Sequence, residues 1–481
     1  MIKKNDTKEQ AAKGIVSMLL NRVIVKAVSF ITKLVLARIL FPQDFGIVAM
    51  GMVFISFLGY MNHFGFGEAI IQRQKKSEKY IDTSLVFLSC VGIALFVISW
   101  ILAPLIAGFY NETVLKTIIR ILAISFILRG VSIIPSAVLE KELAFKKVLL
   151  IEICSIVMYA LFAISMAFMG YGFWSLVWSY VIADAVKALV VWIVRPIRFH
   201  LTVQWNILSQ LFKFGREIIL GGIISFILLQ GDDALVGKVL GAGILGWYVM
   251  AYNISNFPAV NVAHIISGVA FPLFAKVQKH KVELQLAFVK ITKIAALFIL
   301  PATAGIFLLG RIFTKVILGD KWLPIVPALQ ILCIFGILRT VHILFNQILI
   351  ATGQPEWNRR ILCIDLILMV LIIYPFTKYG SIAGTSIAMS LAILPGAIIS
   401  IIITLKKVKV TYTQMLNQLS PIVISCLIMG AGVLVMSRSL PETLSTLIIS
   451  IVSGFFLFAI SILLLDKQLK EEILEFIHLL S

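Results

Sequence analysis

Long apolar runs repeat along this 481-residue chain, and they exclude most folds that it could otherwise adopt. The runs extend from residue 14 to residue 465, and each is close to the roughly 20 residues that a helix needs to cross the hydrocarbon core of a bilayer. Only 14% of the residues are charged, whereas soluble domains average about a quarter. The sequence therefore predicts an all-α integral membrane protein with about fourteen transmembrane helices.

The predicted helices follow the apolar runs in order along the chain. They cover residues 14–40, 46–67, 83–107, 117–139, 148–169, 173–194, 212–237, 244–273, 289–310, 325–350, 360–378, 381–405, 420–437 and 444–465. An even number of spans places both termini on the same side of the membrane. With the N-terminus in the cytoplasm, the cytoplasmic segments hold 25 Lys and Arg residues and the external loops hold 7. Because cytoplasmic loops carry an excess of Lys and Arg, both termini are predicted to be cytoplasmic.

The formal net charge of +19 is explained by basic residues that lie at the membrane surface. Most of the excess Lys and Arg lies in the cytoplasmic segments, where it meets anionic lipid headgroups. The predicted partners therefore include membrane lipids and do not include nucleic acid.

Two segments that lie 200 residues apart resemble each other. Residues 38–50 read RILFPQDFGIVAM and residues 238–250 read KVLGAGILGWYVM, with the basic residue, leucine, glycine and methionine in matching positions. Both segments lie at the external turn between the first two helices of a predicted six-helix unit. Because six is an even number, both units enter the membrane in the same orientation, which predicts two parallel lobes around a central cavity.

The repeat predicts how the chain is divided. The predicted parts are an N-lobe of six helices over residues 1–205, a C-lobe of six helices over residues 206–405, and two further helices with an amphipathic tail over residues 406–481. The two C-terminal helices lie outside the repeat. We expect any substrate path to run between the two lobes.

Charged and polar side chains inside the predicted spans are the candidates for a substrate-binding site. A charge at bilayer depth costs at least about 2.5 kcal/mol, so such residues should face a watery interior. The candidates are Arg22, Lys26, Lys33, Arg129, Arg339, His342 and Asn346. The first three share one stripe of the first helix because they are four and seven residues apart, and the last three follow the same rule on a helix of the second lobe.

Acidic residues at comparable depth are fewer than the basic ones. They are Asp184, Asp232, Asp233 and Asp365. One interpretation is that the buried charges form ion pairs that hold helices together, as Lys187 and Asp184 would one turn apart. The three cations of the first helix exceed the acids that are available to pair with them. The predicted central cavity therefore has surplus positive charge, which suits an anionic cargo such as a pyrophosphate-linked lipid.

The sequence contains no motif for ATP hydrolysis or covalent catalysis. It has no Walker A loop, no HExxH motif and no recognisable nucleophile arrangement, so a transporter without cofactor or metal is predicted rather than an enzyme. An anion of charge about −2 that leaves a negative-inside cell gains about 4 to 5 kcal/mol per 100 mV, so the membrane potential is one candidate driving force. Asp232 and Asp233 are candidates for a second, the binding of a coupling cation from a H⁺ or Na⁺ gradient.

Three segments carry a resemblance to a known family. They are the pattern AxxLxPxxFGxxAM from Ala37 to Met50, the run GFGEAIIQ from Gly65 to Gln72, and the segment from Asp232 to Pro258. With these motifs the chain resembles the Wzx-type oligosaccharide flippases of the multidrug/oligosaccharidyl-lipid/polysaccharide exporter superfamily, in the branch of the colanic acid and teichuronic acid exporters. The motifs mark helix packing and turns, so they do not identify the sugar.

The resemblance implies a function and a location. It implies that a polyprenyl-pyrophosphate-linked oligosaccharide repeat unit is flipped from the cytoplasmic to the external leaflet of the bacterial inner membrane, for capsule, exopolysaccharide or O-antigen assembly. A polysaccharide polymerase and export machinery are the partners expected with it. Two alternatives stay open, a cation-coupled multidrug exporter of the same superfamily and a membrane polysaccharide polymerase. The surplus of cations argues against the first, and the lack of a deep catalytic constellation argues against the second.

Overall fold

The computed structural model describes residues 24–63, 65–72, 78–197, 200, 202–466 and 469–471. None of these residues lies in a β-strand, and eleven of the described helical segments are long and apolar enough to cross a membrane. The predicted all-α membrane fold is confirmed. The count of fourteen helices, the two lobes and their boundaries stay predictions.

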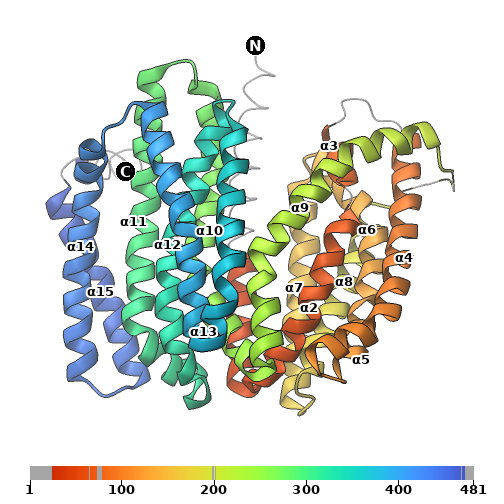
Figure 1. Cartoon of the computed structure of the whole chain (residues 1–481), viewed down its shortest axis with the longest axis horizontal. Coiled ribbons are helices and arrows are strands. Elements are labelled where there is room, and N and C mark those ends of the chain that lie inside the picture. Colours follow the sequence, from red (N-terminus) through yellow and green to blue (C-terminus); the bar gives the residue numbers. More distant parts are fainter. Residues whose placement is uncertain are drawn as a thin grey trace. The chain divides into compact units, whose positions relative to one another are not determined.

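The chain forms two compact units, Met1–Gly246 and Trp247–Ser481. In the first unit, residues 24–39 form the first described helix. The helices that follow are α2 (Pro42–His63), α3 (Phe66–Gln72), α4 (Glu78–Tyr110), α5 (Leu115–Leu122), α6 (Ile124–Lys141), α7 (Phe145–Phe168), α8 (Trp174–Val194) and α9 (Trp205–Leu240), shown in Figure 1. The next helix, α10 (Ala242–Val277), begins in this unit and continues in the second.

Glycines allow α4 and α6 to pack closely in the first unit. A Cβ atom added at Gly92 would lie 2.5 Å from the carbonyl oxygen of Phe126, and one added at Gly130 would lie 2.7 Å from that of Leu88. Small residues at helix contacts let backbones approach in membrane proteins, where apolar side chains gain little from leaving lipid. Helix α6 also packs against α8, and this contact positions polar side chains in the interior of the unit.

The second unit is built from long helices with one irregular connection. After α10 come α11 (Lys281–Phe313), η1 (Thr314–Leu318), η2 (Asp320–Ile325), α12 (Val326–Ala351), α13 (Pro355–Val408), α14 (Tyr412–Ser439) and α15 (Leu444–Leu465). Helices α14 and α15 pack against each other and against α11 (Figure 1). Helix α13 is interrupted at Ser381, whose φ of 53° and ψ of −146° are not helical, so it consists of two consecutive helices. The sequence places two separate spans there, 360–378 and 381–405.

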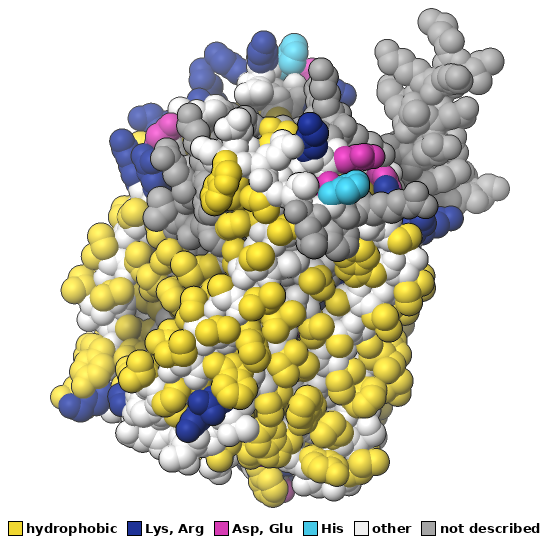
Figure 2. All heavy atoms as spheres, turned by 90° about the vertical axis from the view of Figure 1, so that its right-hand side faces the viewer, with side chains coloured by type: hydrophobic (Ala, Val, Ile, Leu, Met, Phe, Trp, Pro, Cys, Tyr) yellow, Lys and Arg dark blue, Asp and Glu magenta, His cyan; other side chains and the backbone are white. Residues whose placement is uncertain are grey.

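The surface of the first unit has the composition expected next to lipid. Hydrophobic side chains cover the broad middle of the face shown in Figure 2, and most of the charged side chains visible there lie at one end. The exposed hydrophobic residues of α4 include Ile93, Val97, Trp100, Ile101 and Leu105. Large exposed apolar surfaces mark contact with a membrane or a partner, and here the exposed hydrophobic residues continue from Ile93 to Phe109 of α4.

The two matching glycines of the repeat lie against each other's helix. A Cβ atom added at Gly46 would lie 1.7 Å from the carbonyl oxygen of Ala242, and one added at Gly246 would lie 1.8 Å from that of Pro42. The contact is reciprocal, because Pro42 and Ala242 also occupy equivalent positions of the repeat. The glycine that the two segments share therefore has a packing reason, since a side chain at either position would overlap the other helix.

Candidate functional site

The predicted stripe of cations on the first helix is described for two of its three members. Lys26 is exposed and Lys33 is half-buried, and the positive charge of Lys26 acts on Lys33. This proximity agrees with the spacing of seven residues, which places both on one side of the helix. Arg22 lies outside the described residues. The role of all three in substrate binding stays a prediction.

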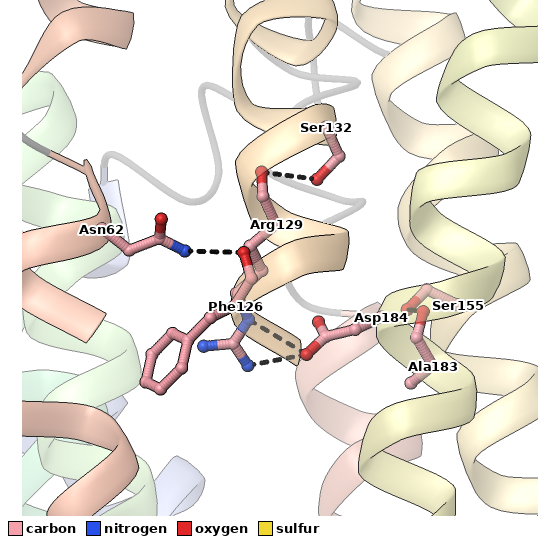
Figure 3. Close-up of polar contacts among 7 residues, drawn as sticks. All are labelled: Asn62, Phe126, Arg129, Ser132, Ser155, Ala183 and Asp184. Carbon is pink, nitrogen blue, oxygen red and sulfur yellow. Dashed lines mark hydrogen bonds and ion pairs between the residues drawn. The ribbon is translucent and has the colours of Figure 1, made fainter. Parts of the chain in front are cut away.

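Arg129, the candidate that lies outside both predicted stripes, forms an ion pair in the interior of the first unit (Figure 3). Its Nε and Nη2 atoms donate to Oδ2 of Asp184 at 3.0 and 2.9 Å, which joins α6 to α8. The two side chains are 33% and 16% exposed. The structure thus pairs Asp184 with Arg129 and not with Lys187, and Arg129 is not a surplus cation. Its assignment to substrate binding stays a prediction.

Other polar contacts surround this ion pair and link further helices. Asn62 of α2 donates to the carbonyl oxygen of Phe126 at 3.3 Å, and Ser155 of α7 donates to that of Ala183 at 2.9 Å (Figure 3). Side-chain hydrogen bonds between membrane helices contribute modestly each, about 0.6 kcal/mol on average. Together they make this part of the unit a polar framework that holds α2, α6, α7 and α8 in register.

The two candidate coupling residues lie on α9 next to α4. Asp232 is 1% exposed and Asp233 is half-buried, and the two carboxyl groups act on each other electrostatically. Asp233 also acts on Tyr110 near the end of α4. One residue earlier, the Phe109 carbonyl oxygen accepts a hydrogen bond from Lys238. Two adjacent carboxyl groups in a poorly hydrated place suit the binding of a cation or a proton, and this role stays a prediction.

The three side chains of the predicted stripe on α12 face two different helices, α10 and α13. Arg339 donates to the hydroxyl of Tyr252 on α10, and its guanidinium lies 6.0 Å from the centre of the Phe335 ring. Both of these partners are neutral, so neither offsets the charge of the guanidinium group. His342 and Asn346 instead point into the contact between α12 and α13, where they are 7% and 4% exposed.

Each of these two buried side chains meets a polar partner on α13. His342 Nε2 lies 3.5 Å from Oδ2 of Asp365, and Asn346 Oδ1 accepts a hydrogen bond from Ser400 at 3.1 Å. Sequence reasoning identified Asp365 only as a deep acid and missed Tyr252 and Ser400. No spacing in the sequence relates these residues to the stripe, because their helices are brought together only by folding.

A second feature that sequence reasoning missed is an apolar cavity of about 510 Å³ in the second unit. It lies between α11, α12 and α14, and its lining includes Phe307, Ile337, Cys426 and Gly430. Its walls are almost entirely apolar, so it suits a hydrocarbon chain better than a sugar or a phosphate.

An ion cluster ties the turn between α14 and α15, which lies outside the membrane-spanning segments, to α11 and η1. Glu442 accepts from Arg311 Nε at 2.9 Å and from Lys315 Nζ at 2.6 Å. These hydrogen bonds hold the pKa of Glu442 below its usual value. Because the pKa of Glu442 is lower in the folded than in the unfolded protein, its ionised carboxylate stabilises the fold at pH values above the unfolded pKa. This stability is lost as the pH falls through the folded pKa.

Wild-type protein is expected to lose thermal stability on acidification, in part because Glu442 becomes protonated. We therefore expect Glu442→Gln to lose less thermal stability than wild type over the same pH range. The effect should be small, under about 1 kcal/mol, because the Arg311 side chain is 65% exposed and water screens the pair. The measurement is the unfolding midpoint of purified protein as a function of pH, for wild type and variant, at low and high salt. A difference that is the same at every pH and salt concentration would contradict this origin.

The fold defines a class of protein, a multi-pass helical membrane protein. It is similar to the solved structure of the lipid II flippase MurJ in an inward closed conformation, with a TM-score of 0.79 and 14% identity, covering 94% of this chain and 99% of that one. At this identity the likeness establishes the fold alone.

The family described as polysaccharide biosynthesis protein matches residues 35–327. The chain is 31% identical to the teichuronic acid biosynthesis protein TuaB of Bacillus subtilis over 62% of its length, and this match spans 63% of the relative. It is 27% identical to the lipopolysaccharide biosynthesis protein WzxC of Escherichia coli, over 80% of its length and 79% of the relative. The chain belongs to the polysaccharide biosynthesis protein family, and the resemblance to Wzx-type flippases is confirmed.

Proposed function

We propose that this chain flips polyprenyl-pyrophosphate-linked oligosaccharide repeat units from the cytoplasmic to the external leaflet of the bacterial inner membrane, for capsule, exopolysaccharide or O-antigen assembly. The observation that carries the proposal is membership of the polysaccharide biosynthesis protein family on a fold similar to that of a lipid II flippase. Both termini lie in the cytoplasm in this proposal, in agreement with the distribution of Lys and Arg along the loops.

The chemistry of the described side chains supports a cargo with an anionic head and an apolar tail. Arg339 contacts neutral partners, and Lys26 and Lys33 share one side of the first helix, so these cations are suited to phosphate oxygens. The apolar cavity between α11, α12 and α14 is suited to part of a hydrocarbon chain. A polysaccharide polymerase and export machinery would receive the flipped unit.

The proposed transport needs a driving force other than ATP. Export of an anion down the membrane potential is one source, and a H⁺ or Na⁺ gradient is the other. In the first unit, Asp232 and Asp233 are the candidates for binding the coupling cation.

The proposal is tested by deleting the gene and measuring lipid-linked repeat units in each leaflet. Accumulation in the cytoplasmic leaflet with loss of surface polysaccharide is the expected result. An unchanged distribution between the leaflets, with polysaccharide still made, would exclude the flippase function. Accumulation of unpolymerised units in the external leaflet would instead point to a polymerase.

The cation stripe on the first helix leads to a further prediction, which is tested in the deletion strain after a variant gene has been supplied. Replacing both Lys26 and Lys33 by alanine should reduce export by about tenfold or more, since a hydrogen bond to a charged group contributes about 1.5–3 kcal/mol. The measurement is surface polysaccharide at matched amounts of inserted protein. Lys116→Ala is the matched control, because Lys116 is exposed at the start of α5, outside the stripe. Wild-type export from the double variant would remove both lysines from the site.

A further inference from the structure

A buried pair of titratable side chains lies at the contact between α12 and α13. His342 Nε2 is 3.5 Å from Asp365 Oδ2, and the two side chains are 9% and 6% exposed. Each residue lies well inside its helix, nine residues before the end of α12 and ten after the start of α13. The support for cargo binding given above uses neither group. An ionisable pair at this depth in a membrane protein is a candidate functional site by default.

The pair has polar atoms that are buried without a hydrogen bond. Among the described residues, Nε2 of His342 and Oδ1 of Asp365 have no hydrogen-bond partner of good geometry, although the backbone of Gly396 lies against the Asp365 carboxyl group. Buried polar atoms are nearly always hydrogen-bonded in native structures, so the facing imidazole and carboxyl atoms need a shared hydrogen between them. A proton held between the imidazole and the carboxyl group would satisfy this contact.

The surroundings favour a proton over a metal ion. A Cβ atom added at Gly396 would lie 2.1 Å from Oδ1 of Asp365, so α13 leaves room for the carboxyl group and for little else. One turn further, Asn346 Oδ1 already accepts a hydrogen bond from Ser400. The described residues contain no group of three or more His, Cys, Asp or Glu side chains that could hold a metal ion. An imidazole and a carboxyl group are sufficient to bind a proton.

The charged neighbours limit the pair to the exchange of one proton. On α12, Arg339 lies one turn before His342, so a second proton on the pair would bring like charges together. Tyr252 of α10 is bonded to Arg339, and Lys293 of α11 is paired with Asp466 at 2.6 Å. The pair therefore has no net charge with one proton and a charge of −1 without it, and the titration belongs to the pair as a whole.

We propose that His342 and Asp365 form a proton-binding site that couples flipping to the transmembrane proton gradient. This inference rests on the proposed function. With its proton the pair is neutral and compatible with the buried contact between α12 and α13. Without the proton the pair carries a net negative charge that is costly to keep buried, so the packing of these two helices depends on proton occupancy. Uptake of a proton from one side and its release on the other then favour different arrangements of the unit in turn.

The proton site is tested on the purified full chain in lipid nanodiscs without cargo. Infrared difference spectra between acid and alkaline buffers should show a carboxylic acid C=O stretch that disappears as the pH rises and is missing in Asp365→Asn. In His342→Gln this band should remain and disappear at a different pH, because the imidazole partner is gone. Ser400→Ala is the matched control, since it changes the neighbouring hydrogen bond and no titratable group. If Asp365→Asn and wild type give the same pH-dependent bands, the proton site is wrong.

Coupling is tested in proteoliposomes that contain a polyprenyl-pyrophosphate-linked oligosaccharide, with and without an imposed pH gradient. The gradient should accelerate flipping by wild type and Ser400→Ala, and this acceleration should be lost in Asp365→Asn and in His342→Gln. Either variant alone decides the result if the other does not fold. Wild-type acceleration in a folded variant would overturn the coupling inference and leave the flippase function intact. If wild type flips no cargo, the proposed function fails, and the infrared titration still decides the proton site.

Discussion

Alanine in place of Gly46 or Gly246 is expected to destabilise the protein strongly and to abolish most export. The added Cβ atom would lie 1.7 Å from the Ala242 oxygen in the first case and 1.8 Å from the Pro42 oxygen in the second. Both obstacles are backbone atoms, so no side-chain rotation relieves the overlap and the two helices must separate. Overpacking of this kind typically costs about 1–3 kcal/mol, and a backbone contact places the cost at the upper end.

Two glycines on the same helices provide the controls. Among the described residues, no atom beyond their own stretch of helix lies within 4 Å of a Cβ atom added at Gly59 on α2 or at Gly243 on α10. Alanine there should leave the unfolding midpoint unchanged or raise it, because glycine is about 1 kcal/mol less favourable than alanine inside a helix. The measurements are the unfolding midpoint of the purified protein and the amount of surface polysaccharide. Equal behaviour of Gly46→Ala and Gly59→Ala would show that the close crossing does not exist in the membrane.

The reciprocity of the contact makes a sharper prediction for the double variant. One separation of α2 from α10 relieves both overlaps, so the second alanine should add little once the first is present. The cost of Gly46→Ala with Gly246→Ala should therefore be well below the sum of the single costs. Additive costs would mean that the two glycines act in independent contacts.

Breaking the ion pair between Arg129 and Asp184 is expected to have the second largest effect. Arg129→Gln or Asp184→Asn alone leaves one charge without its partner between α6 and α8. The expected loss is about 1–3 kcal/mol, less than for fully buried pairs because the Arg129 side chain is 33% exposed. The measurement is the unfolding midpoint of each purified variant next to wild type.

The double variant distinguishes a packing role of Arg129 from a role in cargo binding. With both charges removed, glutamine and asparagine can still bond to each other, and much of the stability should return. Export should return with it if Arg129 only holds the helices together. A stable double variant without export would place Arg129 in the substrate path after all.

The buried polar pairs show where prediction from the sequence stops. The spacing of Arg339, His342 and Asn346 correctly placed them on one helix, but it does not say that the first contacts α10 and the others α13. In the same way, Asp184 lies one turn from Lys187 and yet pairs with Arg129, 55 residues away. Nearness along a helix makes a pair geometrically available. The packing of a second helix determines whether another partner lies closer.

Sequence alone established the all-helical membrane fold, because in lipid each apolar run must satisfy its own backbone hydrogen bonds and only a helix does so within one segment. It also established the family resemblance and the side of the first helix on which Lys26 and Lys33 lie, since helical periodicity is a local property. Packing alone determined three other features: the close contact between α2 and α10 at Gly46 and Gly246, the partners of Arg129 and His342, and the apolar cavity. They depend on which faces of distant helices meet, and that choice is a property of the assembled core and not of any single span.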